Sequence, residues 1–197
     1  MILRAEFALA AALLGASAGC ASAAKTAATP VLSAASRREL AERVSAAWSE
    51  PSRLAARRVM ALYGPPDEVG AGRLTWRGNG PWKRTVVRNR PRSYAGDRGE
   101  DLGVLEQTVD YGLTPEEAVG LAPFSRRLRL DPGRMEMTSR SDREETNFLR
   151  LNLADDVLRG RMTAWEAKDS FERVLRLESS GKTSRYLLEL SFGPKTP

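Results

Sequence analysis

The segment between Ser141 and Gly160 is apolar around most of its circumference when it is drawn as a helix. Its apolar side chains do not keep to one stripe; they are Phe148, Leu149, Leu151, Leu153, Ala154, Val157 and Leu158. Such a helix needs the rest of the chain to cover it. We therefore expect a central buried helix, opened by a cap at Ser141–Glu144. Asn152 lies within it, and a buried amide needs partners, so Asn152 is expected to fasten a loop or a strand edge.

The remaining chain shows more hairpins than crossovers. Capping-box patterns at Ser36–Glu39, Thr114–Glu117 and Thr163–Glu166 predict three further helix starts. A fourth start is expected at Ser49-Glu50-Pro51, where the first helix breaks and a second runs to Gly64. Strand-like alternation is expected on both sides of Asn79, over Gly103–Tyr111, on both sides of a type II turn at Asp131–Arg134, and over Tyr186–Phe192. The order is α-α-β-β-β-α-β-β-α-α-β. It predicts an α+β fold: a single domain over residues 37–192, with an antiparallel sheet of about five to six strands and helices packed mainly on one face. Residues 193–197 are expected to be a tail.

The N-terminus has the composition of a secretory signal over residues 1–20. Arg4 precedes an apolar stretch, Phe7–Ala18, and small residues follow it. The lone cysteine, Cys20, follows Ser17-Ala18-Gly19, which is similar to a lipobox except that Ser17 stands where a larger aliphatic residue is typical. Lipidation of Cys20 is the preferred interpretation, with cleavage after Ala23 or an uncleaved anchor as alternatives. Residues 21–36 are rich in Ala, Ser and Thr and are expected to be a flexible tether.

This leader predicts a place in the bacterial cell envelope. The preferred interpretation is a lipid anchor at Cys20 in the outer membrane, with the domain facing the periplasm. A soluble periplasmic or secreted protein is the alternative.

The stretch from Arg73 to Arg92 holds seven basic residues and no acid, so its local charge of +7 exceeds the +6 of the whole chain. Two tryptophans flank its turn. The candidate surface for an anionic partner consists of Arg73, Trp76, Arg77, Trp82, Lys83, Arg84 and Arg88. Arginine pairs with phosphate or carboxylate, and tryptophan favours lipid interfaces. The competing interpretation is structural: Glu106 and Asp110 on the next strand neutralise Arg84 and Arg88.

Several kinds of chemistry are excluded by composition. The chain has no histidine and one cysteine, so histidine-based catalysis, histidine-ligated metals and intramolecular disulfides are ruled out. No catalytic, cofactor-binding or metal-binding residue is predicted. Candidate carboxylate pairs for acid–base work are Glu106 with Asp110, Asp67 with Glu68, and Asp155 with Asp156. The first pair is about 13 Å apart along its strand, which is too far for one glycosidase site. Ordinary surface carboxylates are the preferred interpretation of all three pairs.

Several short segments together resemble a family of bacterial hypothetical proteins with no known activity. They are Tyr63–Glu68 (YGPPDE), Asn79–Thr85 (NGPWKRT), Leu105–Gln107, Asn147–Leu149 and Asn152–Asp156 (NLADD). The resemblance spans roughly Val59 to Trp165 and implies neither an activity nor any functional residue. A helix ending in Gly-Pro before a Trp-bearing strand is also similar to the small outer-membrane assembly lipoproteins, over about 20 residues.

From these observations we expect an exported envelope (lipo)protein with a non-catalytic binding or structural role. Its expected partner is anionic lipid, a cell-wall glycan or another envelope protein. The export signal disfavours nucleic acid. The alternative function is a histidine-free, carboxylate-dependent envelope hydrolase. No oligomeric state follows from the sequence.

Overall fold

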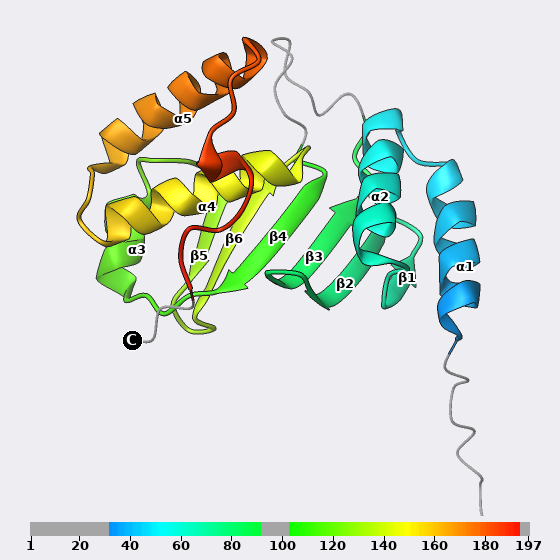
Figure 1. Cartoon of the computed structure of the whole chain (residues 1–197). Coiled ribbons are helices and arrows are strands. Elements are labelled where there is room, and N and C mark those ends of the chain that lie inside the picture. The colour runs from blue at the N-terminus through cyan, green and yellow to red at the C-terminus, as the bar shows by residue number, and fades with distance from the viewer. Residues whose placement is uncertain (1–31, 92–102, 194–197) are drawn as a thin grey trace, which may run out of the picture. The chain divides into compact units, whose positions relative to one another are not determined.

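Six antiparallel strands form one open sheet in the order β1-β2-β3-β4-β6-β5 (Figure 1). The computed structural model describes residues 32–91 and 103–193. The strands are β1 Glu68–Gly70, β2 Arg73–Asn79, β3 Trp82–Arg88, β4 Leu105–Asp110, β5 Leu128–Asp131 and β6 Glu136–Ser141. The predicted leader, Cys20, most of the predicted tether, Arg92 and residues 194–197 lie outside the described ranges.

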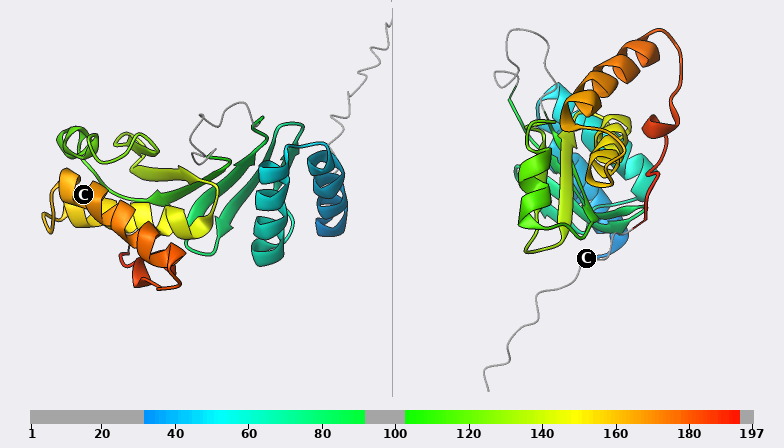
Figure 2. Two further views of the ribbon diagram at one scale, coloured as in Figure 1. Left: turned by 90° about the horizontal axis from the view of Figure 1, so that it is seen from above. Right: turned by 90° about the vertical axis from the view of Figure 1, so that its left-hand side faces the viewer.

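Four helices cover one side of this sheet, and Figure 2 shows them in edge views. They are α1 Ala34–Ala46, α2 Glu50–Tyr63, α4 Glu144–Leu158 and α5 Ala164–Ser179. A shorter helix, α3 Pro115–Leu121, links β4 to β5, and a 3-10 turn spans Arg185–Leu187. The predicted α+β class, with an antiparallel sheet and helices mainly on one face, is confirmed.

Two apolar clusters lie between the helices and the sheet. One surrounds α4 and includes Trp82, Val109, Tyr111, Met137 and residues of α3 and α5. The other lies under α1 and α2 and includes Trp48, Leu74, Trp76, Val87 and Leu105. Tyr63, at the end of α2, packs against both. The sheet therefore carries a separate core for each pair of helices.

The central position of α4 is confirmed. Eleven of its residues are buried, and they include polar ones. The side chain of Asn152 donates to the carbonyls of Tyr186 (3.2 Å) and Glu189 (2.8 Å) and accepts from the backbone N–H of Ser191 (2.8 Å). The expectation that this amide fastens a loop is confirmed.

The same bonds explain why the predicted last strand is absent. The alternation of Tyr186, Leu188, Leu190 and Phe192 fits a strand, but the segment forms a 3-10 turn and then irregular chain. Its backbone groups bond to Asn152 and not to a sheet edge, and Leu188 is 62% exposed. The sixth strand is instead β1, three residues long, which the sequence analysis missed.

The helix starts were predicted with mixed success. The capping boxes at Thr114 and Thr163 are both present. The one at Ser36 is wrong, because Ser33 accepts the N–H of Ser36 and α1 already begins at Ala34. The cap predicted at Ser141 is also wrong. The hydroxyl of Ser141 donates to the carbonyl of Arg143, and Arg143 is the N-cap residue of α4.

The turn between β5 and β6 also differs from the expected type II turn. The left-handed residue is Met135 (φ 52°) and not Gly133. Met135 is 49% exposed. Its carbonyl accepts the N–H of Tyr111 at 2.7 Å, which places it at the end of the β4–β6 ladder.

Candidate functional site

The predicted basic hairpin is β2 paired with β3, and the two faces of the sheet divide its residues. Trp76 and Trp82 are 2% and 1% exposed and lie under the helices. The indole N–H of Trp76 donates to the carbonyl of Gly64 (3.0 Å), and the ring of Trp82 stacks on Phe148 at 4.8 Å. The two tryptophans are therefore core residues and are not part of an exposed surface.

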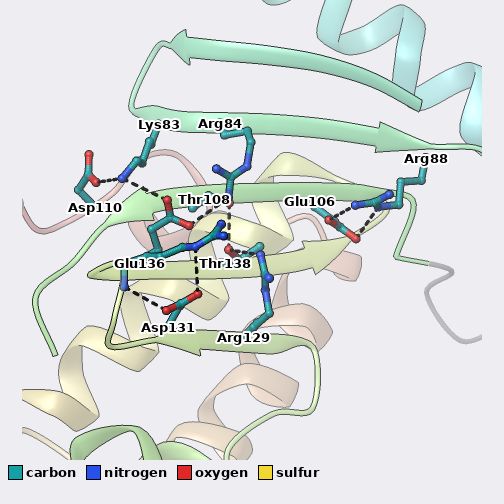
Figure 3. Close-up of polar contacts among 11 residues, drawn as sticks. Lys83, Arg84, Arg88, Glu106, Thr108, Asp110, Arg129, Asp131, Glu136 and Thr138 are labelled. Carbon is teal, nitrogen blue, oxygen red and sulfur yellow. Dashed lines mark hydrogen bonds and ion pairs between the residues drawn. The ribbon is translucent and has the colours of Figure 1, made fainter. Parts of the chain in front are cut away.

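The basic side chains lie on the face of the sheet turned away from α4, here called the outer face. Strand alternation would send Lys83 and Arg84 to opposite faces, but both contact Glu136 on the outer face. Arg84 lies opposite Thr108, which lies opposite Thr138, which lies opposite Arg129. The outer face thus collects polar side chains from β3, β4, β6 and β5 in neighbouring rows (Figure 3).

Carboxylates neutralise most of the hairpin cations. Arg88 contacts Glu106 through two hydrogen bonds of 2.9 and 3.2 Å. Lys83 lies 2.6 Å from Asp110 and 3.1 Å from Glu136, and Arg84 lies 3.0 Å from Glu136. Arg77 pairs with Glu68 of β1. Of the predicted cations, Arg73 is the one that has no ion pair within the described ranges.

The structural interpretation of the hairpin is thereby confirmed in part. Glu106 neutralises Arg88 as expected. Asp110 pairs with Lys83, whereas Arg84 pairs with Glu136, which the sequence analysis did not single out. Glu136 lies on β6, and only the pairing of β6 with β4 brings it to the hairpin. No local sequence pattern predicts the pairing of β6 with β4.

The pKa directions agree with these ion pairs. Burial by itself would raise the pKa of Glu136, but hydrogen bonds from Arg84 and Lys83 outweigh it and hold the pKa below its usual 4.5. The hydrogen bond to Asp110, followed by that to Glu136, raises the pKa of Lys83. The hydrogen bond from Arg77 lowers the pKa of Glu68. All three groups are stabilised in their charged forms.

Glu136→Gln is expected to lower the free energy of unfolding by about 1–2 kcal/mol at neutral pH. Breaking a buried pair costs more, but water reaches Lys83 and Arg84 and reduces the loss. Because the folded pKa of Glu136 is lowered, its contribution is complete above 4.5 and is lost as the pH falls through the folded value. Urea unfolding at several pH values measures both effects.

Glu172→Gln is the control for this test, because Glu172 is exposed and forms only a 3.8 Å pair with Arg176. A loss that is equal in the two variants, or an acid dependence unchanged by Glu136→Gln, contradicts the prediction.

The carboxylate pairs proposed for acid–base work also have partners. Asp155 accepts from Tyr111 (2.8 Å) and Arg159 (2.8 Å), and Asp156 accepts from Tyr186 (2.6 Å). Arg161 bridges both carboxylates. Asp67 accepts the N–H of Arg77, and Glu68 binds its guanidinium. Within residues 32–91 and 103–193, no three Cys, Asp or Glu side chains are arranged to hold a metal ion.

A different basic feature lies between α1 and α2. A groove of about 360 Å³ is lined there by Arg38, Glu42, Ser45, Ala46, Arg53, Arg57, Met60 and Ala61. Arg38 and Glu42 are 3.8 Å apart, a looser pair than those of the outer face. Arg57 is exposed and has no ion pair with any described residue. No run of charge in the sequence predicts this groove, because its arginines come from two different helices.

Along the described stretches, none of the helices combines the length and the apolar character that crossing a bilayer requires. Comparison with protein-family models, with curated proteins and with solved structures finds no match for this chain.

Proposed function

We propose that this chain is an exported, lipid-anchored envelope protein that binds an anionic membrane surface without catalysis. The proposed contact surface is the α1–α2 pair and not the β2–β3 hairpin. One observation carries this choice. Among the described residues, Arg38 of the α1–α2 groove lies 3.8 Å from its acid, and Arg53 and Arg57 have no ion pair. The hairpin cations other than Arg73 lie 2.5–3.1 Å from acids.

The charge count supports the same surface. Residues 34–63 contain six arginines and three glutamates, so six minus three leaves a net charge of +3. The six arginines are Arg37, Arg38, Arg43, Arg53, Arg57 and Arg58. An excess of this size attracts anionic lipid head groups, and the attraction weakens with added salt.

The position of α1 in the chain is the second support. Residues 21–33 separate the proposed lipid anchor at Cys20 from the first residue of α1. At roughly 3.5 Å per residue these 13 residues reach at most about 45 Å. A lipid at Cys20 would therefore keep the α1–α2 pair close to the membrane that it is proposed to bind.

The test is sedimentation with vesicles of phosphatidylglycerol and phosphatidylethanolamine. Residues from Leu32 onward form one compact unit, so the chain is used from Ala21, without the leader and without an acyl group. Replacing Arg38, Arg53 and Arg57 together by Gln is expected to lower vesicle partitioning on the order of a hundredfold, at about 1 kcal/mol per charge near the surface. Thermal unfolding checks that the variant is folded.

The matched control replaces Lys168, Arg173 and Arg176 of α5 by Gln, which removes the same charge from exposed positions. Partitioning close to that of the unmodified chain is expected. An equal fall in both triple variants would show diffuse attraction and overturn the choice of α1–α2. Absence of binding to anionic vesicles by the unmodified chain would overturn the proposed function.

A further inference from the structure

We propose that the α1–α2 groove is a binding site for a phosphate group, in a phosphomonoester or phosphodiester. This rests on the proposed function, because it assigns the head-group contact of the same surface to a built site. Three arginines surround one groove with apolar walls, and two of them are oriented by contacts across it.

The arginines converge from both helices. Arg38 comes from α1, and Arg53 and Arg57 come from α2 at a spacing of four residues, which places them on one face of that helix. One N–H of Arg38 donates to the carbonyl of Met60 at 3.3 Å, across the groove. One N–H of Arg53 donates to the carbonyl of Ala46 at 3.5 Å, also across the groove.

These contacts with backbone carbonyls orient two guanidinium groups and use only one N–H donor of each. Each guanidinium has five N–H donors in a planar fork, so most donors of Arg38 and Arg53 are left for a ligand. The side chain of Arg57 makes no hydrogen bond to any described residue. Part of the entropy cost of ordering the arginines is therefore met before a ligand arrives.

A phosphate group fits this arrangement for chemical reasons. Its oxygens accept paired N–H bonds from arginine forks, and three cations favour a compact anion. Ala46, Met60 and Ala61 supply apolar wall beside the arginines. They suit the carbon skeleton that carries the phosphate, such as glycerol.

Glu42 is the one acidic side chain that lines the groove, and it lies 3.8 Å from Arg38. A substitution at Glu42 therefore tests the phosphate site independently of the arginines. A bound anion competes with this carboxylate for Arg38 and is repelled by it. Glu42→Gln removes the competition and the repulsion, so it is expected to strengthen phosphate binding severalfold.

The decisive experiment titrates the chain from Ala21 with inorganic phosphate and with glycerol 3-phosphate, followed by amide chemical shifts of Ala46 and Ala61. Arg57→Lys keeps the charge but loses the fork, so it is expected to weaken glycerol 3-phosphate binding about tenfold. Its vesicle partitioning is expected to fall in the same direction but by less, because the charge that attracts the protein to the anionic surface is kept. Arg173→Lys, on exposed α5, is the control and is expected to change neither quantity.

The outcomes separate the two claims. If Arg57→Lys and Glu42→Gln leave glycerol 3-phosphate binding unchanged, the phosphate site is wrong, even when the triple variant still loses vesicle binding. If soluble phosphates bind with the expected variant effects but anionic vesicles do not, the site stands for a free phosphate compound and the membrane function fails. Binding of both, with both sets of effects, supports a lipid head group.

Discussion

Glu144→Ala is expected to lower the free energy of unfolding by about 3–5 kcal/mol, the largest effect that we predict for one residue. One oxygen of this carboxylate accepts from the hydroxyl of Tyr63 (2.9 Å), the indole N–H of Trp82 (2.5 Å) and the amide of Gln107 (2.6 Å). These donors come from α2, β3 and β4. Each buried donor left without a partner costs about 1–3 kcal/mol.

Two of the three donors are shielded from water, although Glu144 and Tyr63 are themselves half-buried. Trp82 is 1% exposed and Gln107 is fully buried. Burial, followed by the charge of Glu144, raises the pKa of Tyr63 to about 12, so the phenol stays protonated as a donor. Tyr63 is also fixed from the other side, because a Cβ on Gly80 would lie 2.8 Å from its ring.

Chemical denaturation measures the loss, and Glu145→Ala is the matched control. Glu145 is the next residue of α4 and is exposed, and its side chain makes no hydrogen bond to any described residue. Glu144→Gln, which keeps an acceptor at the same place, is expected to lose about half as much. Equal losses in Glu144→Ala and Glu145→Ala would falsify the role assigned to this carboxylate.

Asp155→Ala is expected to lower the free energy of unfolding by about 3 kcal/mol. The Asp155 side chain is 1% exposed and holds Tyr111, Arg159 and Arg161. Removing one partner of a buried ion pair leaves the others uncompensated. The estimate stays at the lower end because Arg159 and Arg161 are about half exposed and can turn to water.

Burial, followed by the hydrogen bond to Asp155, raises the pKa of Tyr111, so this phenol also stays a neutral donor. Asp155→Asn keeps the shape and an acceptor and is expected to lose less than Asp155→Ala. The control is Asp169→Ala, at an exposed position of α5. A thermal unfolding midpoint that falls as little for Asp155→Ala as for Asp169→Ala contradicts the prediction.

Local patterns predicted most of the fold. The apolar side chains around the whole circumference of α4 predicted its burial, and the capping boxes at Thr114 and Thr163 predicted two helix starts. These predictions succeeded because each signal lies within one element. The strand expected near Tyr186 failed because its alternation is real but Asn152, far away in sequence, takes its backbone bonds. β1 was missed because three residues are too few to show a period.

The candidate site was predicted less well, for the same reason of distance in sequence. Glu106 was assigned to the hairpin because β3 and β4 are consecutive strands. Glu136 was not assigned, because β6 reaches the hairpin only through β4. The arginines of the groove, Arg38, Arg53 and Arg57, become neighbours only when α1 and α2 pack together.

The two separate cores have a kinetic consequence. α1 contacts α2 and β1, α2 contacts β3, and β1, β2 and β3 are consecutive hairpin strands, so the core beneath α1 and α2 is closed almost wholly by residues 34–88. Contacts between neighbours in sequence form quickly, because little loop entropy is lost. During synthesis, which proceeds from the N-terminus, residues 34–88 can therefore fold before α4 has been made. The rest of the domain then folds against β3, because β4 pairs with that strand. Glu144 of α4 connects the two parts through its hydrogen bonds with Tyr63 and Trp82.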